Sequence, residues 1–287
     1  NKMANLKEIR NRIVSVSSTM QITSAMKMVS AAKLKKAQDA ITAMRPYSEK
    51  LTELIQSLSA SLEGDVAANY TTQREVKKVL VVAITSNRGL CGALNSNVLK
   101  QVKILTEKYG HDNVGIFAIG KKANDGLHKT NYVIANRSDI FDDLTFENTA
   151  EIAQSLTHLF LDGEYDKIEL VYNQFVNAAT QIVVNEQFLP LAPIKGSEAI
   201  SSDYIFEPSK EEIVLELIPK SLKTQLYKAV RDSFAAEHGA RMTAMHKATD
   251  NATDLRNQLK LTYNKARQAA ITGEILEIVG GAEALNN

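Results

Sequence analysis

A seven-residue hydrophobic repeat runs through the first part of this chain and constrains its fold more than any other feature. Its positions alternate steps of three and four residues, which keeps one face of a helix turned towards a partner helix. They are Leu6, Ile9, Ile13, Val16, Met20, Thr23, Lys27, Ser30, Leu34, Ala37, Ile41 and Met44. The spacing resumes after Pro46, so we expect the proline to kink or restart this helix and not to end it.

A second repeat of the same kind returns in the carboxyl-terminal part of the chain. It reads Met245, Ala248, Ala252, Leu255, Leu259, Thr262, Ala266 and Ala269. Two terminal helices with matching seams, separated by a globular insert, most simply pair with each other in an antiparallel coiled coil. We therefore expect an amino-terminal coiled-coil helix in residues 1–62, an inserted domain in residues 63–207 and a carboxyl-terminal helix in residues 208–287.

The inserted segment has the pattern of an α/β domain. Short β-branched runs occupy residues 79–85, 113–120, 167–175 and 180–190, and amphipathic stretches occupy residues 92–109 and 147–162. Alternation of this kind predicts a mainly parallel sheet flanked by helices. The last two runs are close enough in sequence to pair as an antiparallel edge.

The charge of the chain is unevenly distributed. Residues 1–50 carry 10 Lys and Arg against 3 Asp and Glu, whereas residues 51–207 carry 13 against 20. The basic segment is either a solvated helix face or a docking surface for an acidic partner. Nucleic acid is disfavoured, because the lysines near residue 35 have no aromatic neighbours on which bases could stack.

The chain carries little that resembles catalytic chemistry. Its single cysteine excludes an intrachain disulfide and fits a reducing compartment, and no stretch approaches the length of a membrane span. The five histidines are scattered, and each is expected to be an exposed helical or loop residue. We expect no metal, no cofactor and no catalytic residue.

The run SNRGLCGALN, residues 86–95, is the one candidate for a nucleotide site. It follows a predicted strand and leads into a predicted helix, as many phosphate-binding loops do. However, it matches neither the P-loop nor the dinucleotide fingerprint, and no base lies near Cys91 in sequence. A tight strand-to-helix turn is the favoured interpretation, with Cys91 packed as a small buried hydrophobe, and a ligand site is the alternative.

The polar run near the carboxyl terminus invites two interpretations. Residues 263–274 gather hydrogen-bonding side chains on one stretch of helix, which is either a solvated face or a partner contact. The segment that follows is apolar, which is unusual for an exposed helix end unless a partner surrounds it.

Four motifs resemble one known family. They are ITSAMKMVSAAKLKKAQ (22–38), SNRGLCGALN (86–95), ARMTAMHKATDNA (240–252) and YNKARQAAITGEILEIVGGAEAL (263–285). Together they are similar to the γ subunit of bacterial F-type ATP synthase, and the likeness covers nearly the whole chain. The resemblance implies a central rotor shaft in which both terminal helices form the coiled coil and the inserted domain is Rossmann-like.

The resemblance also implies partners. The shaft would turn inside a hexamer of three α and three β subunits, whose β subunits hold the catalytic sites, and the inserted domain would contact the ε subunit and the membrane c-ring. The complex would lie on the cytoplasmic face of the bacterial inner membrane and couple proton translocation to ATP synthesis or hydrolysis. One copy per complex, without nucleic acid, is expected.

Roles for individual residues follow from the same resemblance. A β-subunit catch contact is implied for Lys265, Arg267, Gln268, Thr272 and Glu274. Shaft surface facing the lower ends of the β subunits is implied for Thr23, Met26, Lys27 and Ser30. An apolar tip inside the hexamer is implied for Ile275, Ile278, Val279 and Leu285, and a foot contact near ε and the c-ring for Tyr204 and Glu207.

Lys27 departs from the family pattern, which often has Glu at this position, so it would attract an acidic β-subunit loop. Two other classes of protein stay open at this point. One is an enzyme or nucleotide-binding protein built on the α/β domain, and the other is a purely structural coiled-coil spacer.

Overall fold

The computed structural model describes residues 2–61, 68–191 and 210–285. Two long helices begin and end the chain: α1, Lys2–Ser61, and α6, Lys210–Leu285. Both helices contribute to two compact units, one made of residues 1–30 with 242–287 and the other of residues 31–241. The expected boundaries at residues 62 and 207 lie outside the described residues and stay a prediction.

The first unit is an antiparallel pair of helices. The Thr23 and Thr249 hydroxyls lie 2.8 Å apart, and the Thr253 hydroxyl donates to the Met20 sulfur at 3.3 Å. Moving forward along α1 therefore moves backward along α6, as expected for two terminal helices joined through an inserted domain. The antiparallel coiled coil is confirmed.

The predicted seam of α1 is confirmed position by position. Every one of its residues from Leu6 to Met44 is buried or half-buried, and Pro46 lies inside the helix without ending it. The predicted seam of α6 is confirmed only in part. Met245, Ala252, Leu259 and Ala266 face inward, but Leu255, Thr262 and Ala269 are exposed, and their neighbours Arg256, Tyr263 and Ala270 are half-buried in their place.

The displaced positions have a physical explanation. The observed set still repeats every seven residues, so only one position in each heptad moves by one residue. Hydrophobicity alone favours Leu255 over Arg256, whereas the long aliphatic stem of an Arg side chain can cover apolar surface. The Arg256 guanidinium donates to the Asn257 side-chain oxygen at 3.5 Å.

The second unit contains a five-stranded sheet in the order β3-β2-β1-β4-β5. The strands are β1 Val79–Ile84, β2 Val114–Ile119, β3 Tyr132–Asn136, β4 Lys167–Phe175 and β5 Gln181–Leu189. The first four run parallel and β5 pairs antiparallel with β4, as the sequence predicts. Strand β3 was not predicted, because this five-residue edge strand has no buried residue and therefore no strong hydrophobic pattern.

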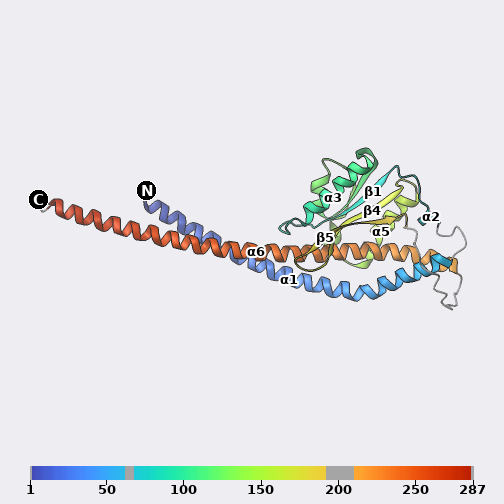
Figure 1. The fold of residues 1–287 in the computed structure, drawn as a ribbon, viewed down its shortest axis with the longest axis horizontal. Coiled ribbons are helices and arrows are strands. Elements are labelled where there is room, and N and C mark those ends of the chain that lie inside the picture. Colours follow the sequence, from blue (N-terminus) through green and yellow to red (C-terminus); the bar gives the residue numbers. More distant parts are fainter. Residues whose placement is uncertain (1, 62–67, 192–209, 286–287) are drawn as a thin grey trace. The chain divides into compact units, whose positions relative to one another are not determined.

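Helices cover both faces of the sheet (Figure 1). The face formed by Val79, Val81 and Ala83 packs against α3, Leu94–Tyr109, and α4, Lys121–Leu127. The face formed by Leu80, Val82 and Ile84 packs against α5, Phe146–Leu161, and against residues 218–230 of α6. The segment of α6 that belongs to this unit is thus part of the domain core.

Short elements complete the domain. They are α2, Ala68–Thr71, and the 3-10 turns η2, His111–Asn113, and η3, Asp139–Phe141. In residues 2–61, 68–191 and 210–285, no helix combines the length and the hydropathy that a bilayer span requires.

Candidate functional site

The carboxyl edge of the sheet is where a doubly wound α/β fold would hold a ligand. Such sites lie where the direction of the strand order reverses, because the loops after neighbouring strands separate there. In this sheet β1 leads outward through β2 to β3, and the chain then returns to β4 on the other side of β1. The crevice is therefore bounded by the loop after β1, residues 85–93, and by the end of β4.

The loop after β1 is a fixed turn, as its sequence predicts. Ser86 donates from its backbone nitrogen to the Asn95 Oδ1 at 3.0 Å, and the Asn95 side chain donates to the Cys91 sulfur at 3.3 Å. Gly92 has a φ of 62°, and so does Leu90, for which this left-handed conformation is unfavourable. The strand before the loop and helix α3 after it are both confirmed.

Cys91 is a buried hydrophobe and not an exposed nucleophile. It is 2% exposed and packs with Leu94 and with Ala236 and Ala240 of α6. Burial raises the pKa of its thiol, which keeps the sulfur protonated and unreactive. The sequence interpretation of Cys91 is confirmed.

Helix α6 fills the crevice between the ends of β1 and β4. Ala236 and Ala240 contact the loop after β1, and Phe175, the last residue of β4, packs against the same cluster. Gly239 allows the closest approach: a β-carbon there would lie 3.3 Å from Cα of Ala178 and 3.3 Å from a ring carbon of Phe175. Small side chains at 236, 239 and 240 therefore let the helix backbone enter the space that a ligand would need.

Arg241 supplies a cation at the same place. Its guanidinium donates to the carbonyl oxygens of Arg88 at 3.0 Å and Gly89 at 3.1 Å, and it also pairs with the Glu237 carboxylate at 2.7 Å. Arg241 is 7% exposed, so these are charge-assisted bonds formed away from water. We call Arg241, Glu237 and the two carbonyl groups the Arg241 cluster.

Two neighbouring ionisable groups are perturbed by burial. Burial raises the pKa of Glu237, and the adjacent Arg241 guanidinium counteracts the rise. Burial, followed by repulsion from Arg241 and Lys33, lowers the pKa of His238 to about 3. The His238 ring packs edge-on against Phe234 with centroids 4.5 Å apart, and it is neutral at physiological pH.

The expectation that all five histidines are exposed is wrong for His238, which is 5% exposed. His111, His128, His158 and His246 are exposed as expected. Reasoning from sequence also missed Arg241, because its acceptors are backbone oxygens about 150 residues away and no pattern announces them. In the described residues, no group of three or more His, Cys, Asp or Glu side chains could hold a metal ion.

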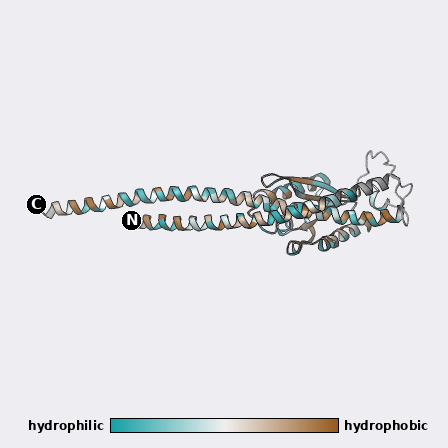
Figure 2. Ribbon diagram, turned by 90° about the horizontal axis from the view of Figure 1, so that it is seen from below, coloured by the Kyte–Doolittle hydropathy of each residue, from teal (hydrophilic) through white to brown (hydrophobic). Residues whose placement is uncertain are grey.

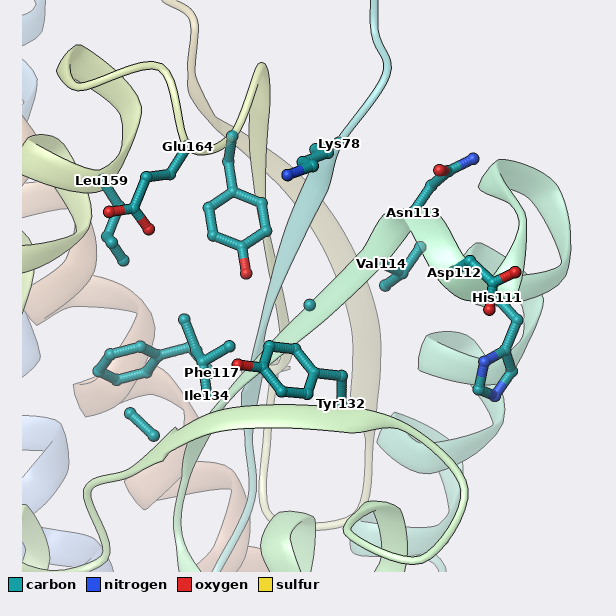
Figure 3. A pocket seen from close by; sticks show the side chains of 13 residues that line it. Lys78, His111, Asp112, Asn113, Val114, Phe117, Tyr132, Ile134, Leu159 and Glu164 are labelled. Atoms are coloured by element: carbon teal, nitrogen blue, oxygen red, sulfur yellow. The ribbon is translucent and has the colours of Figure 1, made fainter.

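An open cavity of about 860 Å³ lies at the opposite, amino edge of the sheet (Figure 3). Figure 3 shows Lys78, Asp112, Tyr132 and Glu164 around it, and Phe117 forms an apolar wall. The carboxylates of Asp112 and Glu164 outnumber the single Lys78 ammonium, which disfavours a phosphate. The cavity also lies away from the edge at which this fold class binds ligands.

The side chains with predicted partner roles lie on the two terminal helices. The catch residues Lys265, Arg267, Gln268, Thr272 and Glu274 are all exposed on α6. In the tip, Ile275, Ile278 and Val279 are 54%, 71% and 50% exposed, and the Leu285 side chain is outside the described residues. Figure 2 shows hydrophobic residues returning towards this end of α6.

The shaft-surface residues on α1 differ in exposure. Thr23 and Ser30 are 8% and 3% exposed, and Met26 and Lys27 are half-buried. The neighbouring apolar side chains Ile22 and Met28 are 60% and 65% exposed. Tyr204 and Glu207 lie outside the described residues. The partner contacts of all these residues stay a prediction.

The fold and these surfaces define a class of protein: a two-helix coiled coil with an inserted Rossmann-like domain whose ligand crevice is filled by its own helix. A sequence profile described as ATP synthase matches residues 5–285. The chain is 79% identical to the ATP synthase gamma chain of Flavobacterium johnsoniae over 285 residues, which cover 99% of this chain and 100% of the relative. It therefore belongs to the ATP synthase gamma chain family.

More distant relatives agree. The chain is 52% identical to the ATP synthase gamma chain of Cytophaga hutchinsonii, covering 99% of this chain and 100% of the relative. Among solved structures, a chain of the Euglena gracilis mitochondrial ATP synthase, from an assembly of OSCP, F1 and c-ring, has a TM-score of 0.72 at 23% identity. The match covers 98% of this chain and 95% of that one, and it shows the shared fold.

Proposed function

We propose that this chain is the central rotor shaft of an F1Fo ATP synthase. In this role it transmits torque between the membrane c-ring and the catalytic hexamer of α and β subunits, and it couples proton translocation to ATP synthesis or hydrolysis. It has no active site of its own. The proposal places one copy in each complex, peripheral to the cytoplasmic face of the bacterial inner membrane.

One observation carries the proposal beyond family membership: the paired terminal helices expose apolar side chains. On α1, Val14, Ile22, Met28 and Val29 are between 57% and 65% exposed. On α6, Leu276 and Ile278 are 67% and 71% exposed. Apolar surface of this extent on a soluble helix pair is typical of a protein interface, and a surrounding hexamer would cover it.

Within the described residues, the carboxyl-terminal stretch of α6 extends beyond Lys2, the first described residue of its partner helix. The Thr23–Thr249 contact sets the register, and continuing it places the start of α1 opposite about residue 270 of α6. Every described side chain from Glu274 onward is exposed. Exposed apolar side chains at this end of α6 fit a tip that turns inside a collar of other subunits.

The catch contact is proposed for Lys265, Arg267, Gln268, Thr272 and Glu274, whose exposed side chains could bond a β-subunit loop. Met26 and Lys27 are proposed to face the lower ends of the β subunits, together with the part of the helix surface around Thr23 and Ser30. The tip is proposed to comprise Ile275, Ile278, Val279 and Leu285. Tyr204 and Glu207 are proposed to lie near ε and the c-ring.

The filled crevice argues against the alternative of a nucleotide-binding enzyme. A ligand at the carboxyl edge would have to displace Gly239 and the Arg241 cluster, whose bonds are buried. A purely structural spacer predicts no effect on a catalytic partner, which reconstitution can test.

The test is affinity purification of the tagged chain from its native membrane, followed by reconstitution with cognate α and β subunits. The α, β, ε and c subunits should copurify. The variant Arg267→Ala should weaken the assembly about tenfold or more, because it removes a charge-assisted hydrogen bond. Lys260→Ala, another exposed cation seven residues earlier on α6, is the control, and equal loss in both variants would contradict the catch assignment.

A further inference from the structure

Arg241 occupies a special place along α6. It is the last residue of α6 that belongs to the unit containing the α/β domain, and the next residue, Met242, belongs to the helix pair. A twist that enters α6 from residues 242–285 therefore enters the unit of the α/β domain at Arg241.

Other polar contacts hold α6 to the domain further back. Gln225 donates to the Glu186 carboxylate at 2.7 Å, and Arg231 donates to the Leu144 carbonyl oxygen at 2.8 Å. With a rise of about 1.5 Å per residue, these contacts lie roughly 15–24 Å behind Arg241 along the helix. When several contacts along a rod resist a torque, the load is not divided equally among them. The contact nearest the point where the torque is applied bears the largest share of the load.

The Arg241 cluster is built to resist such a twist. The planar guanidinium reaches the carbonyl oxygens of Arg88 and Gly89 with the same nitrogen and Glu237 with another. A Lys ammonium lacks this fork and cannot hold acceptors in fixed directions. The acceptors on the domain side are backbone atoms, so a force on Arg241 passes directly into the main chain of the loop.

The loop that receives this force is itself anchored to the sheet. The Asn173 side chain of β4 donates to the Leu94 carbonyl oxygen at 3.1 Å, and Asn95 and Ser86 bond each other across the turn. Force on the loop therefore divides between β1, which precedes it, and the neighbouring strand β4.

We propose that the Arg241 cluster is the joint through which torque passes between the shaft helix α6 and the α/β domain. This inference rests on the proposed rotor function. Arg241 is in this respect a positioning residue, because it keeps the domain turning together with α6 under load. Without Arg241 the domain slips, which means that it lags behind the rotating helix, while ATP hydrolysis in the hexamer is unchanged.

The test measures rotation of the α/β domain while the hexamer is fixed to a surface. A bead is attached to the domain through Lys103→Cys, on the exposed face of α3, and ATP hydrolysis by the same complex is measured in parallel. The variants are Arg241→Met, Arg241→Lys and the double change Glu237→Gln with Arg241→Met, which leaves no buried charge unpaired. Val98→Ala, a fully buried residue of the same unit outside the cluster, is the matched control for stability.

With a small, weakly loaded particle, all variants should rotate and hydrolyse ATP as the wild type does. With a large bead, Arg241→Met and the double variant should slip about tenfold more often per ATP, the change expected from losing a charge-assisted hydrogen bond. Arg241→Lys should lie between them and the wild type, and Val98→Ala should not slip.

Two results would contradict the proposed role of the Arg241 cluster. One is that Arg241→Met and the double variant slip no more often than the wild type, and the other is that Val98→Ala slips as often as Arg241→Met. A wild-type complex that hydrolyses ATP without moving either particle would instead contradict the rotor function itself. The two failures are therefore distinguishable.

Discussion

Gly239 is the residue at which α6 comes closest to the end of the sheet, and replacing it tests whether the helix fills the crevice. In a helix interior, Ala is more favourable than Gly by about 1 kcal/mol. Against this gain, a β-carbon at 239 would meet Cα of Ala178 and the Phe175 ring at 3.3 Å, closer than carbon atoms normally pack. Overpacking of this kind costs about 1–3 kcal/mol.

The two contributions predict a graded series. Gly239→Ala should lower the free energy of unfolding by about 1 kcal/mol, because the steric cost exceeds the gain in helix propensity. Gly239→Leu adds several more carbons to filled space and should lower it by about 3 kcal/mol or more. The measurement is urea unfolding of the full chain followed by circular dichroism.

Gly280→Ala is the control, because nothing lies within 4 Å of a β-carbon built at that position of α6. It should leave the unfolding midpoint unchanged or raise it. A neutral surface change alters the free energy of unfolding by about 0.5 kcal/mol or less. If Gly239→Leu changes it by no more than this, the crevice has room for a side chain, and the conclusion that α6 fills it is wrong.

Three further predictions concern single side chains. His238 has a pKa of about 3 when folded and about 6.5 when unfolded. Between these two values the unfolded chain binds a proton that the folded chain does not, so the free energy of unfolding is highest above about pH 6.5 and falls as the pH is lowered towards 3. Between pH 7 and 5 the wild type should lose about 2 kcal/mol more than His238→Gln in urea unfolding, and parallel losses would contradict its burial as a neutral group. Cys91 should react with a thiol reagent far more slowly in the native chain than in urea, and Gly239→Leu should speed the native reaction; rapid labelling of the wild type would show that the thiol is accessible. Lys27→Glu should change the torque or rate of the assembled complex only modestly, so complete loss of rotation in a single-molecule assay would mean that the contact of this half-buried residue is misjudged.

The parts of the fold that sequence patterns predicted are those with strong periodicity. The α1 seam follows directly from the spacing of Leu6 to Met44, because burial on one helix face requires that spacing whatever the partner is. Strands β1 and β2 are entirely buried and β4 is buried at six of its nine residues, so their apolar runs are conspicuous. Strand β3 has no such run, since it lies at the sheet edge and is only half-buried.

The contact between α6 and the loop after β1 could not be predicted from sequence patterns, for a different reason. Arg241 donates to the backbone carbonyl oxygens of Arg88 and Gly89. Because every residue has such an oxygen, the identity of these two residues does not indicate that they are the acceptors. Gly239, Ala236 and Ala240 look like ordinary small helix residues until the sheet edge is placed beside them. SNRGLCGALN could be identified as a turn, but its contact with α6 emerges only from the tertiary fold.

The most direct test of the central claim is to watch this chain turn. A single assembly of this chain with cognate α and β subunits, fixed through the hexamer and carrying a small probe on the α/β domain, is observed as ATP is added. The rotor account predicts rotation in one direction that requires ATP and stops when it is removed. Steady ATP hydrolysis by the same assembly with a stationary probe would contradict it.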